Sequence, residues 1–258
     1  MKISRFKQGE ATSFGMVEDE RIFAIDLSYT RTGAVFPFNR VEILAPVEPS
    51  KIVCVGRNYV DHARELGNAV PTEPLLFLKA PSSVIASGDS IVIPRQSSQV
   101  EHEGELAVVV RTQCKDIRDD EDPLQYILGY TCLNDVTARD VQRKDVQFTR
   151  GKSFDTFCPI GPWIETGLDV RDISVECRVN GEVMQRGRTS EMVFPVDYLI
   201  RYISRQMTLE AGDVIATGTP AGVSKMNSGD VCEVEIAGIG ILSNPIVGAA
   251  ALSSTAGQ

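Results

Sequence analysis

The sequence has little histidine, no long apolar segment and no excess of basic residues. Only 2 of its 258 residues are histidine. No apolar run approaches the roughly 20 residues that a membrane-spanning helix needs, and the first ten residues, "MKISRFKQGE", lack the apolar stretch of a secretory signal. The net charge is -9, whereas non-specific nucleic-acid binding requires a basic surface. We therefore expect a cytoplasmic protein that binds neither membrane nor nucleic acid.

The cysteines are scattered rather than paired. None of the six belongs to a CxxC pair, so the sequence indicates neither a zinc site nor a disulfide framework. Some lie within apolar runs such as "KIVCVG" and "GDVCEVEI", which is typical of reduced core residues in a cytoplasmic protein. The six residues are Cys54, Cys114, Cys132, Cys158, Cys177 and Cys232.

Strand patterns dominate what the sequence does contain. A Gly-Asp turn precedes a β-branched strand at residues 88–94, 211–220 and 228–236. The run "CRVNGEVMQ" predicts a hairpin with Asn180 and Gly181 at its turn. There is no internal repeat of 20–50 residues. The pattern predicts an α+β fold in which β-structure is the majority.

Three segments favour helices. Residues 58–67 could begin with Asn58 as N-cap and end at Gly67. Residues 137–148 could be capped by Thr137. Residues 195–207 place apolar side chains at helical spacing behind Pro195.

Prolines mark a domain boundary near residue 48. Pro46 and Pro49 separate short strand patterns in the first 45 residues from a clean apolar strand. We expect a small N-terminal β domain at 1–48, a catalytic domain at 49–248 and a frayed tail of small and polar residues at 249–258.

The stretch "VEHEGELAVVV" places Glu101, Glu103 and Glu105 at alternate positions, directly before an apolar run. Alternate residues of a strand share a face, so these carboxylates would repel one another. An exposed edge strand would tolerate them. The residues that follow look fully buried, and a strand gains nothing from Gly104 unless another group approaches it closely. Both features argue against such an edge. If the strand is regular, His102 points away from Glu103 and Glu105, and it either supports the site from behind or packs in the core.

A divalent cation would turn this repulsion into attraction, and carboxylate oxygens select hard ions such as Mg²⁺ or Mn²⁺. A third acid must come from elsewhere. Asp135, between an apolar strand and a predicted helix, is the best candidate. By its local sequence it could equally be a helix-capping residue.

Six motifs in this order resemble the fumarylacetoacetate hydrolase family over about residues 50 to 247, and the first 45 residues resemble the small extra domain of some bacterial members. The motifs are "VGRNYVDHARELG", "EPLLFLK", "EHEGELAVVV", "NDVTARDVQ", "GKSFDTFCPIGP" and "TGTPAGV". The resemblance implies a mixed β-roll, a homodimer, and one Mg²⁺ or Mn²⁺ per chain held by Glu103, Glu105 and Asp135. Glu101 lies outside the motif.

The resemblance also assigns roles to other residues. His62 and Glu65 correspond to the general base pair, and Lys152 lies near the metal. Because three carboxylates and a divalent cation sum to −1, the positive charge of Lys152 would help an anionic oxo acid to bind. The substrate-binding candidates are Gln142, Gly218 and Thr219 from the motifs, with Arg57 and Lys79.

Each of these residues also has an ordinary interpretation. His62 and Glu65 could be a surface pair at i,i+3 on a charged helix. Lys79 could end a buried strand in solvent, and Arg57 could be a loop cation. Gln142 could be a solvated helix residue and Gly218 a turn glycine.

Family members cleave or rearrange small 2-oxo acids, so the resemblance implies an enzyme. The first prediction is cleavage of a C–C bond in a small 2-oxo or 2,4-dioxo acid through a metal-stabilised enolate, as in an acylpyruvate hydrolase or an oxaloacetate decarboxylase. The alternative is a 2-hydroxyhepta-2,4-diene-1,7-dioate isomerase of aromatic catabolism. An inactive oxo-acid-binding or scaffold protein is the rival from another class, but such a relative should have lost some of the site residues.

Overall fold

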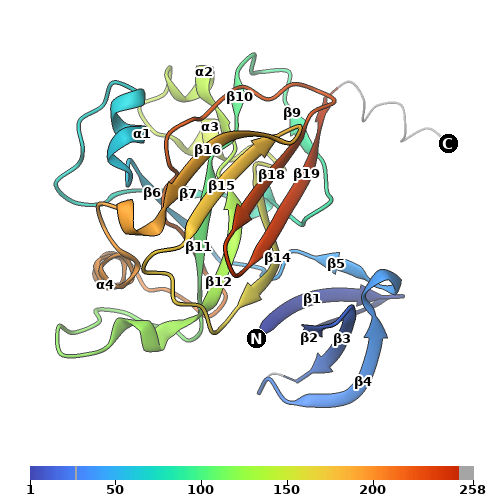
Figure 1. Cartoon of the computed structure of the whole chain (residues 1–258). Coiled ribbons are helices and arrows are strands. Elements are labelled where there is room, and N and C mark those ends of the chain that lie inside the picture. The colour runs from blue at the N-terminus through green and yellow to red at the C-terminus, as the bar shows by residue number, and fades with distance from the viewer. Residues whose placement is uncertain (27, 250–258) are drawn as a thin grey trace.

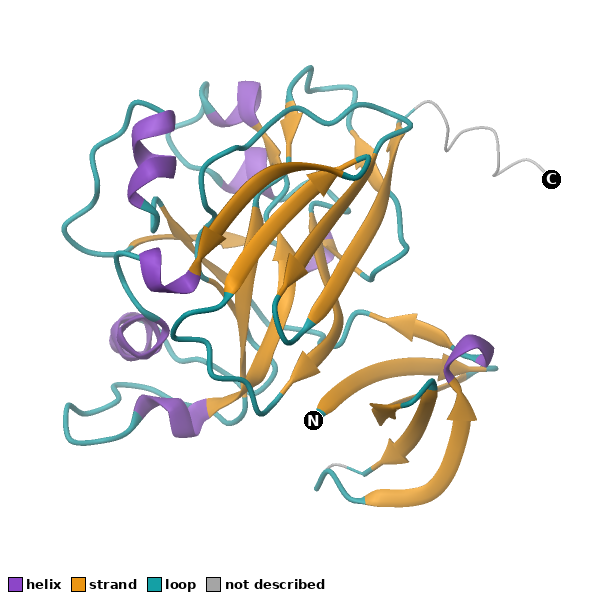
Figure 2. Ribbon diagram, in the orientation of Figure 1, coloured by secondary structure: helices purple, strands orange, loops and turns teal. Residues whose placement is uncertain are grey.

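The computed structural model describes residues 1–26 and 28–249, and strands are its predominant regular secondary structure (Figures 1 and 2). A large mixed sheet packs against a second sheet, with short helices around them. This confirms the predicted α+β fold with β-structure in the majority. The tail predicted at 249–258 lies outside the described residues except for Ala249.

The N-terminal unit consists of strands that extend the large sheet and enclose a core of their own, formed by Phe6, Ile22 and Ala24. In Figure 1 it lies to one side of the molecule, in blue, and β1 connects it to β14 of the large sheet. The predicted boundary between residues 48 and 49 falls in the connection between β5 and β6. The strands of the N-terminal unit are β1 (Lys2–Gln8), β2 (Ala11–Glu18), β3 (Arg21–Ile25), β4 (Arg31–Pro37) and β5 (Glu42–Leu44).

The large sheet has the order β4-β3-β2-β1-β14-β12-β11-β17-β6-β7, with β5 paired to β1 and β8 paired to β14. Its remaining strands are β6 (Ile52–Gly56), β7 (Leu75–Lys79), β8 (Val84–Ile85), β11 (Gly104–Val110), β12 (Ile127–Asn134), β14 (Cys158–Glu165) and β17 (Val214–Ala216).

The second sheet has the order β16-β15-β18-β19-β9, and a separate short pair joins β10 to β13. The Gly-Asp turns precede β9, β17 and β18, and the hairpin turn at Asn180 and Gly181 connects β15 to β16, as predicted. The strands are β9 (Ile91–Ile93), β10 (Val100–Glu101), β13 (Thr137–Ala138), β15 (Ser174–Val179), β16 (Glu182–Arg188), β18 (Val231–Ile236) and β19 (Gly240–Gly248).

The helices are short, and no helix of the described chain is long and apolar enough to cross a membrane. The α-helices are α1 (Val60–Glu65), α2 (Arg139–Gln142), α3 (Thr149–Lys152) and α4 (Val196–Gln206). The 3-10 turns are η1 (Phe38–Arg40), η2 (Pro81–Ser83), η3 (Pro123–Tyr126) and η4 (Thr189–Glu191).

Two of the helix predictions need correction. Asn58 does not cap α1; its buried amide bonds the backbone of Phe194 and Thr217 instead. Thr137 lies in β13, and its hydroxyl donates to the carbonyl of Asp135. The predicted helix 137–148 is reduced to the four residues of α2. Tertiary partners take the amide of Asn58, whereas the hydroxyl of Thr137 is taken by a local carbonyl two residues before it.

β11 is buried on both faces, as its apolar run predicts. Leu106, Val108 and Val110 belong to the core between the two sheets, whereas Ala107 and Val109 belong to the core on the opposite face. A strand in this position holds the residues at its start firmly.

Gly104 marks a close approach of the second sheet. A Cβ atom added there would lie 3.1 Å from Cys177 Cβ and 3.3 Å from Val234 Cγ1. The predicted close approach is therefore confirmed, and its cause is packing between the sheets.

All six cysteines are free and buried, as predicted for core residues.

The start of β11 and the ends of three other strands lie at one edge of the large sheet. Gly104 pairs with Asn134 of antiparallel β12, and Ala107 pairs with Ala216 of antiparallel β17. Ala216 in turn pairs with Cys54 of β6, which runs parallel to β17. This topology brings residues just before β11 close to residues just after β12, β17 and β6.

Candidate metal centre

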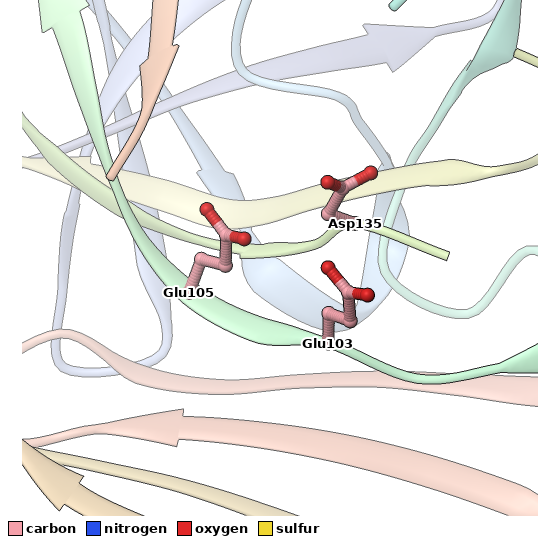
Figure 3. A group of neighbouring side chains, drawn as sticks. All are labelled: Glu103, Glu105 and Asp135. Carbon is pink, nitrogen blue, oxygen red and sulfur yellow. The ribbon is translucent and has the colours of Figure 1, made fainter. Parts of the chain in front are cut away.

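Three buried carboxylates meet at this edge. Glu105 lies in β11, Glu103 just before it, and Asp135 directly after β12. Each offers an oxygen, and these oxygens all lie within 4.8 Å of one another (Figure 3). The predicted triad is therefore assembled by strand pairing, and an exposed edge strand is excluded because all three residues are buried.

Two lysines compensate part of the negative charge. Lys152 Nζ lies 2.7 Å from both Glu103 Oε2 and Asp135 Oδ2. Lys79 Nζ donates to Asp135 Oδ1 at 2.6 Å and to the carbonyl of Val136 at 3.1 Å. Burial alone would lower the pKa of Lys152, but the two carboxylates outweigh it and raise that pKa. Asp135 is thus held from two sides, and the ammonium of Lys152 bridges two of the predicted metal ligands.

Arg139 supplies the third cation. Its guanidinium contacts Glu101 Oε2 at 2.7 Å and Glu103 Oε1 at 2.5 Å. Glu101 is therefore neutralised outside the triad, and the regular strand across residues 101–105 is interrupted between β10 and β11. Burial would raise the pKa of Glu103, but Lys152 and Arg139 hold it well below its usual range.

Glu105 has no such compensation. Within the described residues it forms no ion pair, and its Oε2 accepts a hydrogen bond from the backbone N–H of Gly218 at 2.7 Å. Burial, followed by the charges of Asp135 and Glu103, raises the pKa of Glu105 well above its usual value. A divalent cation among these oxygens would supply the missing positive charge, and the all-oxygen donor set fits Mg²⁺ or Mn²⁺.

A cavity of about 420 Å³ opens onto the triad. Six of the other predicted site residues line it: Arg57, His62, Glu65, Gln142, Lys152 and Thr219. Two others do not. Lys79 is 1% exposed and binds Asp135, and Gly218 binds Glu105. Both contact metal-ligand side chains rather than the cavity, so their placement does not match the predicted substrate-binding role.

His62 and Glu65 lie together on α1 at the cavity wall. His62 is only 5% exposed, which excludes the surface pair considered above. Its Nδ1 lies 3.4 Å from Glu65 Oε2 but forms no hydrogen bond with any described residue. The Glu65 carboxylate accepts the backbone N–H of Gly222 at 3.0 and 3.1 Å. Burial, aided by Arg139 and Lys152, lowers the pKa of His62 although Glu103 opposes the shift, so near neutral pH the lowered pKa favours the neutral imidazole, which can accept a proton.

Sequence reasoning missed several residues of the site. Arg139 stands inside the motif "NDVTARDVQ", four residues after Asp135, and its charge beside the acids was an available signal. Arg143 lines the cavity one residue beyond the same motif. The sequence around Gln185 contains no motif that indicates a role in the site. His102, predicted to support the site or to pack in the core, is fully buried, with Nδ1 2.9 Å from Gln185 Oε1 and Nε2 2.9 Å from Ser224 Oγ.

Comparison with known proteins agrees with the fold. The model described as fumarylacetoacetate (FAA) hydrolase C-terminal matches residues 51–247, and the model described as Rv2993c-like, N-terminal matches residues 1–46. An uncharacterized protein of Archaeoglobus fulgidus is 53% identical over 83% of this chain and 86% of its own length. A human protein named as a mitochondrial oxaloacetate tautomerase is 42% identical over 93% of this chain and 78% of its own. The crystal structure of a 5-carboxymethyl-2-hydroxymuconate delta-isomerase from Mycobacterium smegmatis superposes with a TM-score of 0.90 at 40% identity, covering 96% of this chain and 100% of that one. The chain therefore belongs to the fumarylacetoacetate hydrolase family.

Proposed function

We propose that this chain is a divalent-metal-dependent enzyme that interconverts or cleaves a small 2-oxo acid through its enol form. The observation that carries the proposal is the position of a neutral, buried imidazole, His62, on the same cavity as the carboxylate triad. Glu103, Glu105 and Asp135 would hold Mg²⁺ or Mn²⁺. The bound cation would act as a Lewis acid that stabilises negative charge on the C2 oxygen of the acid.

The side chains of the cavity would transfer protons and bind the substrate. His62 removes a proton from C3 of the oxo acid, or from a water molecule, and Glu65 stabilises the imidazolium that results. Lys152 adds positive charge beside Glu103 and Asp135, which favours binding of an anion. Gln142, whose carbonyl oxygen accepts from Arg139 at 2.7 Å, offers its amide N–H groups to the cavity.

Two net reactions would rely on an enolate that the cation stabilises, either the enolate of the intact acid or the enolate left when its C3–C4 bond breaks. Moving a proton between the C2 oxygen and C3 interconverts the enol and keto forms of an acid such as oxaloacetate. We place this proton transfer first, because the human relative and the mycobacterial structure carry names for reactions of this kind. Cleavage of the C3–C4 bond, the first prediction from sequence, is the second candidate. It is favoured by the His62–Glu65 pair, which supplies the base that hydrolysis of an acylpyruvate needs.

A substrate panel tests the proposal directly. Enol-to-keto conversion of oxaloacetate, release of pyruvate from oxaloacetate and hydrolysis of an acylpyruvate should be followed in parallel with Mg²⁺. We expect at least one rate to exceed the uncatalysed rate by orders of magnitude and to be lost in excess EDTA. Rates unaffected by EDTA, or no acceleration of any of the three reactions, would contradict the proposal.

The pH dependence of the rate should report the neutral imidazole. Because the pKa of His62 is lowered from 6.5, the base is protonated and inactive only in more acidic solution. We expect kcat/KM to rise with pH to a plateau, with the midpoint of the rise below pH 6.5. The matched comparison is His62→Gln, whose residual rate should lack this acidic limb. A limb of the same midpoint in that variant would assign it to another group.

Two cations of the cavity suggest a second carboxylate on the substrate. Arg57 and Arg143 both line the cavity, and neither forms an ion pair with a described residue. Arg57 is held with φ of 59°, a conformation that is unfavourable for arginine and common at ligand-binding sites. We therefore expect Arg57→Gln to weaken binding of 2-oxoglutarate, a dicarboxylate, by about 10- to 100-fold, as for a lost charged hydrogen bond.

The same variant should bind 2-oxobutanoate, which lacks the distal carboxylate, as the wild type does. Calorimetric titration in the presence of Mg²⁺ measures both affinities. Arg111 is an exposed residue directly after β11, at the end far from the triad. Arg111→Gln therefore controls for the change in net charge. Equal losses for both acids would mean that Arg57 does not read the distal carboxylate.

A further inference from the structure

The side chain of Gln185 connects segments of the site that are far apart in sequence. Gln185 lies in β16 of the second sheet and is fully buried. Its Oε1 lies 3.0 Å from the backbone N of Gly104 and 2.9 Å from His102 Nδ1. Its Nε2 donates to Thr219 Oγ1 at 2.7 Å and to the carbonyl of Pro220 at 2.6 Å. The amide thus links the segment before β11 to the loop after β17.

The network admits only one orientation of this amide. Rotating it by half a turn would place the NH₂ group against the N–H of Gly104 and the oxygen against the carbonyl of Pro220. His102 must then carry its proton on Nδ1, to donate to Gln185, while its Nε2 accepts from the hydroxyl of Ser224. Every hydrogen-bonding position of the Gln185 side chain is therefore used.

The backbone that Gln185 holds is the one that presents two metal ligands. Residues 102 and 103 lie between β10 and β11 and belong to neither strand. The N–H of Glu103 is satisfied by the side chain of Asn134 at 2.9 Å, and the N–H of Gly104 by Gln185. Pairing with β12 holds this segment only in part, through Gly104 opposite Asn134 and the carbonyl of Glu103, which accepts from the N–H of Asp135 at 2.8 Å. The N–H groups of Glu103 and Gly104 depend on the two side-chain acceptors.

The loop on the other side of the amide touches the same segment. Thr219 donates its hydroxyl proton to the carbonyl of Gly104 at 2.8 Å, and Gly218 donates its N–H to Glu105. Gln185, Gly104 and Thr219 therefore form a closed ring of hydrogen bonds. Thr219 lines the cavity, whereas Gln185 does not.

We propose that Gln185 is a positioning residue, which fixes Glu103 and Glu105 relative to the cavity wall at Thr219 without touching metal or substrate. The inference rests on the proposed metal site. Residues that support metal ligands in this way typically contribute about 10- to 100-fold to metal affinity. We expect Gln185→Met, which keeps the side-chain length but removes all four hydrogen bonds, to weaken Mn²⁺ binding by that factor.

A matched variant separates positioning from stability. Asn244 is also a buried amide, whose Nδ2 donates to the carbonyls of Ala86 at 2.8 Å and Asp89 at 2.9 Å, away from the cavity. Asn244→Leu should lower the melting temperature as Gln185→Met does but leave the Mn²⁺ affinity unchanged. Mn²⁺ binding is measured by electron paramagnetic resonance, without any assay of activity. Wild-type Mn²⁺ affinity in Gln185→Met would reduce Gln185 to a structural residue and overturn the proposal.

A second substitution keeps the test decisive if Gln185→Met does not fold. Gln185→Glu retains an acceptor for Gly104 but loses both donors toward Thr219 and Pro220. We expect it to recover part of the Mn²⁺ affinity and, at saturating metal, to raise the KM for oxaloacetate more than it changes kcat. Unchanged affinity and unchanged KM would contradict the proposal. Wild-type protein that binds no Mn²⁺ would instead refute the proposed function, and this inference with it.

Discussion

Glu105→Gln should eliminate Mn²⁺ binding and, at the same time, stabilise the metal-free chain. Glu105 is a buried carboxylate without a cationic partner among the described residues, so its negative charge is unfavourable unless a metal compensates it. The amide keeps an oxygen for the N–H of Gly218 and offers new donors toward Asp135 and Glu103. We expect a gain of about 1–3 kcal/mol in the free energy of unfolding of the metal-free protein near neutral pH.

The pH dependence of this gain has a definite sign. In the folded wild type the pKa of Glu105 is raised above the usual 4.5, so protonated Glu105 favours folding. That contribution is present below about pH 4.5 and is lost as the pH rises toward the folded-state pKa. The stability difference between Glu105→Gln and the wild type should therefore be small in acid and grow with pH, in thermal unfolding measured with EDTA.

Glu103→Gln is the matched control, because it removes a metal ligand of the same type with the opposite effect on stability. Glu103 is bonded to Lys152 and Arg139, and its pKa is lowered. Breaking these buried pairs should destabilise the metal-free chain by about 3–5 kcal/mol. Both variants should lose metal-dependent turnover by ~10² or more, since Lewis-acid catalysis contributes several kcal/mol. If both variants shift the free energy of unfolding in the same direction, Glu105 and Glu103 do not differ in charge compensation as proposed.

The parts of the site that sequence could predict are those coded locally. The alternation of Glu103 and Glu105, the apolar run behind them and Gly104 all lie within ten residues, and strand geometry relates them. Asp135 lies farther along the chain, and only the pairing of β11 with β12 brings it beside the two glutamates. The resemblance to the family supplied His62, Glu65 and Lys152, whose own sequence context also suits a solvated helix or loop.

The compensating network could not be predicted in the same way. Arg139 neutralises Glu101 and Glu103 across 38 and 36 positions of the chain, and Gln185 reaches Gly104 across 81. The charge of Arg139 close to Asp135 signals a cation near the acids, but no periodicity identifies which acids it pairs with, because the pairing depends on which strands pack together. The same physics explains why Asn58 does not cap α1, because its amide donates to the distant carbonyls of Phe194 and Thr217. Thr137 also has the right side chain for a cap, but its hydroxyl donates to the nearby carbonyl of Asp135.

His62→Ala should separate water activation from enol chemistry. If His62 is the general base of a hydrolytic reaction, its loss should reduce kcat on an acylpyruvate by the ~10²–10⁴ typical of a missing base. Binding of oxalate in the presence of Mg²⁺ should change little, because the metal makes that interaction. Tautomerisation of oxaloacetate should fall by a similar factor, since it requires a proton to be moved at C3.

Decarboxylation of oxaloacetate makes a different demand on the same residue. Loss of CO₂ generates the enolate without a nucleophile and without removal of a C3 proton, so His62→Ala should impair this reaction far less than the other two. All three rates can be measured on one preparation of the variant, with Glu65→Gln as a companion that keeps the imidazole but removes the carboxylate 3.4 Å from it. We expect Glu65→Gln to show the same order of losses, each smaller. Equal losses in all three reactions would mean that His62 contributes something common to them, such as the packing of α1 against the cavity, and would exclude it as the base.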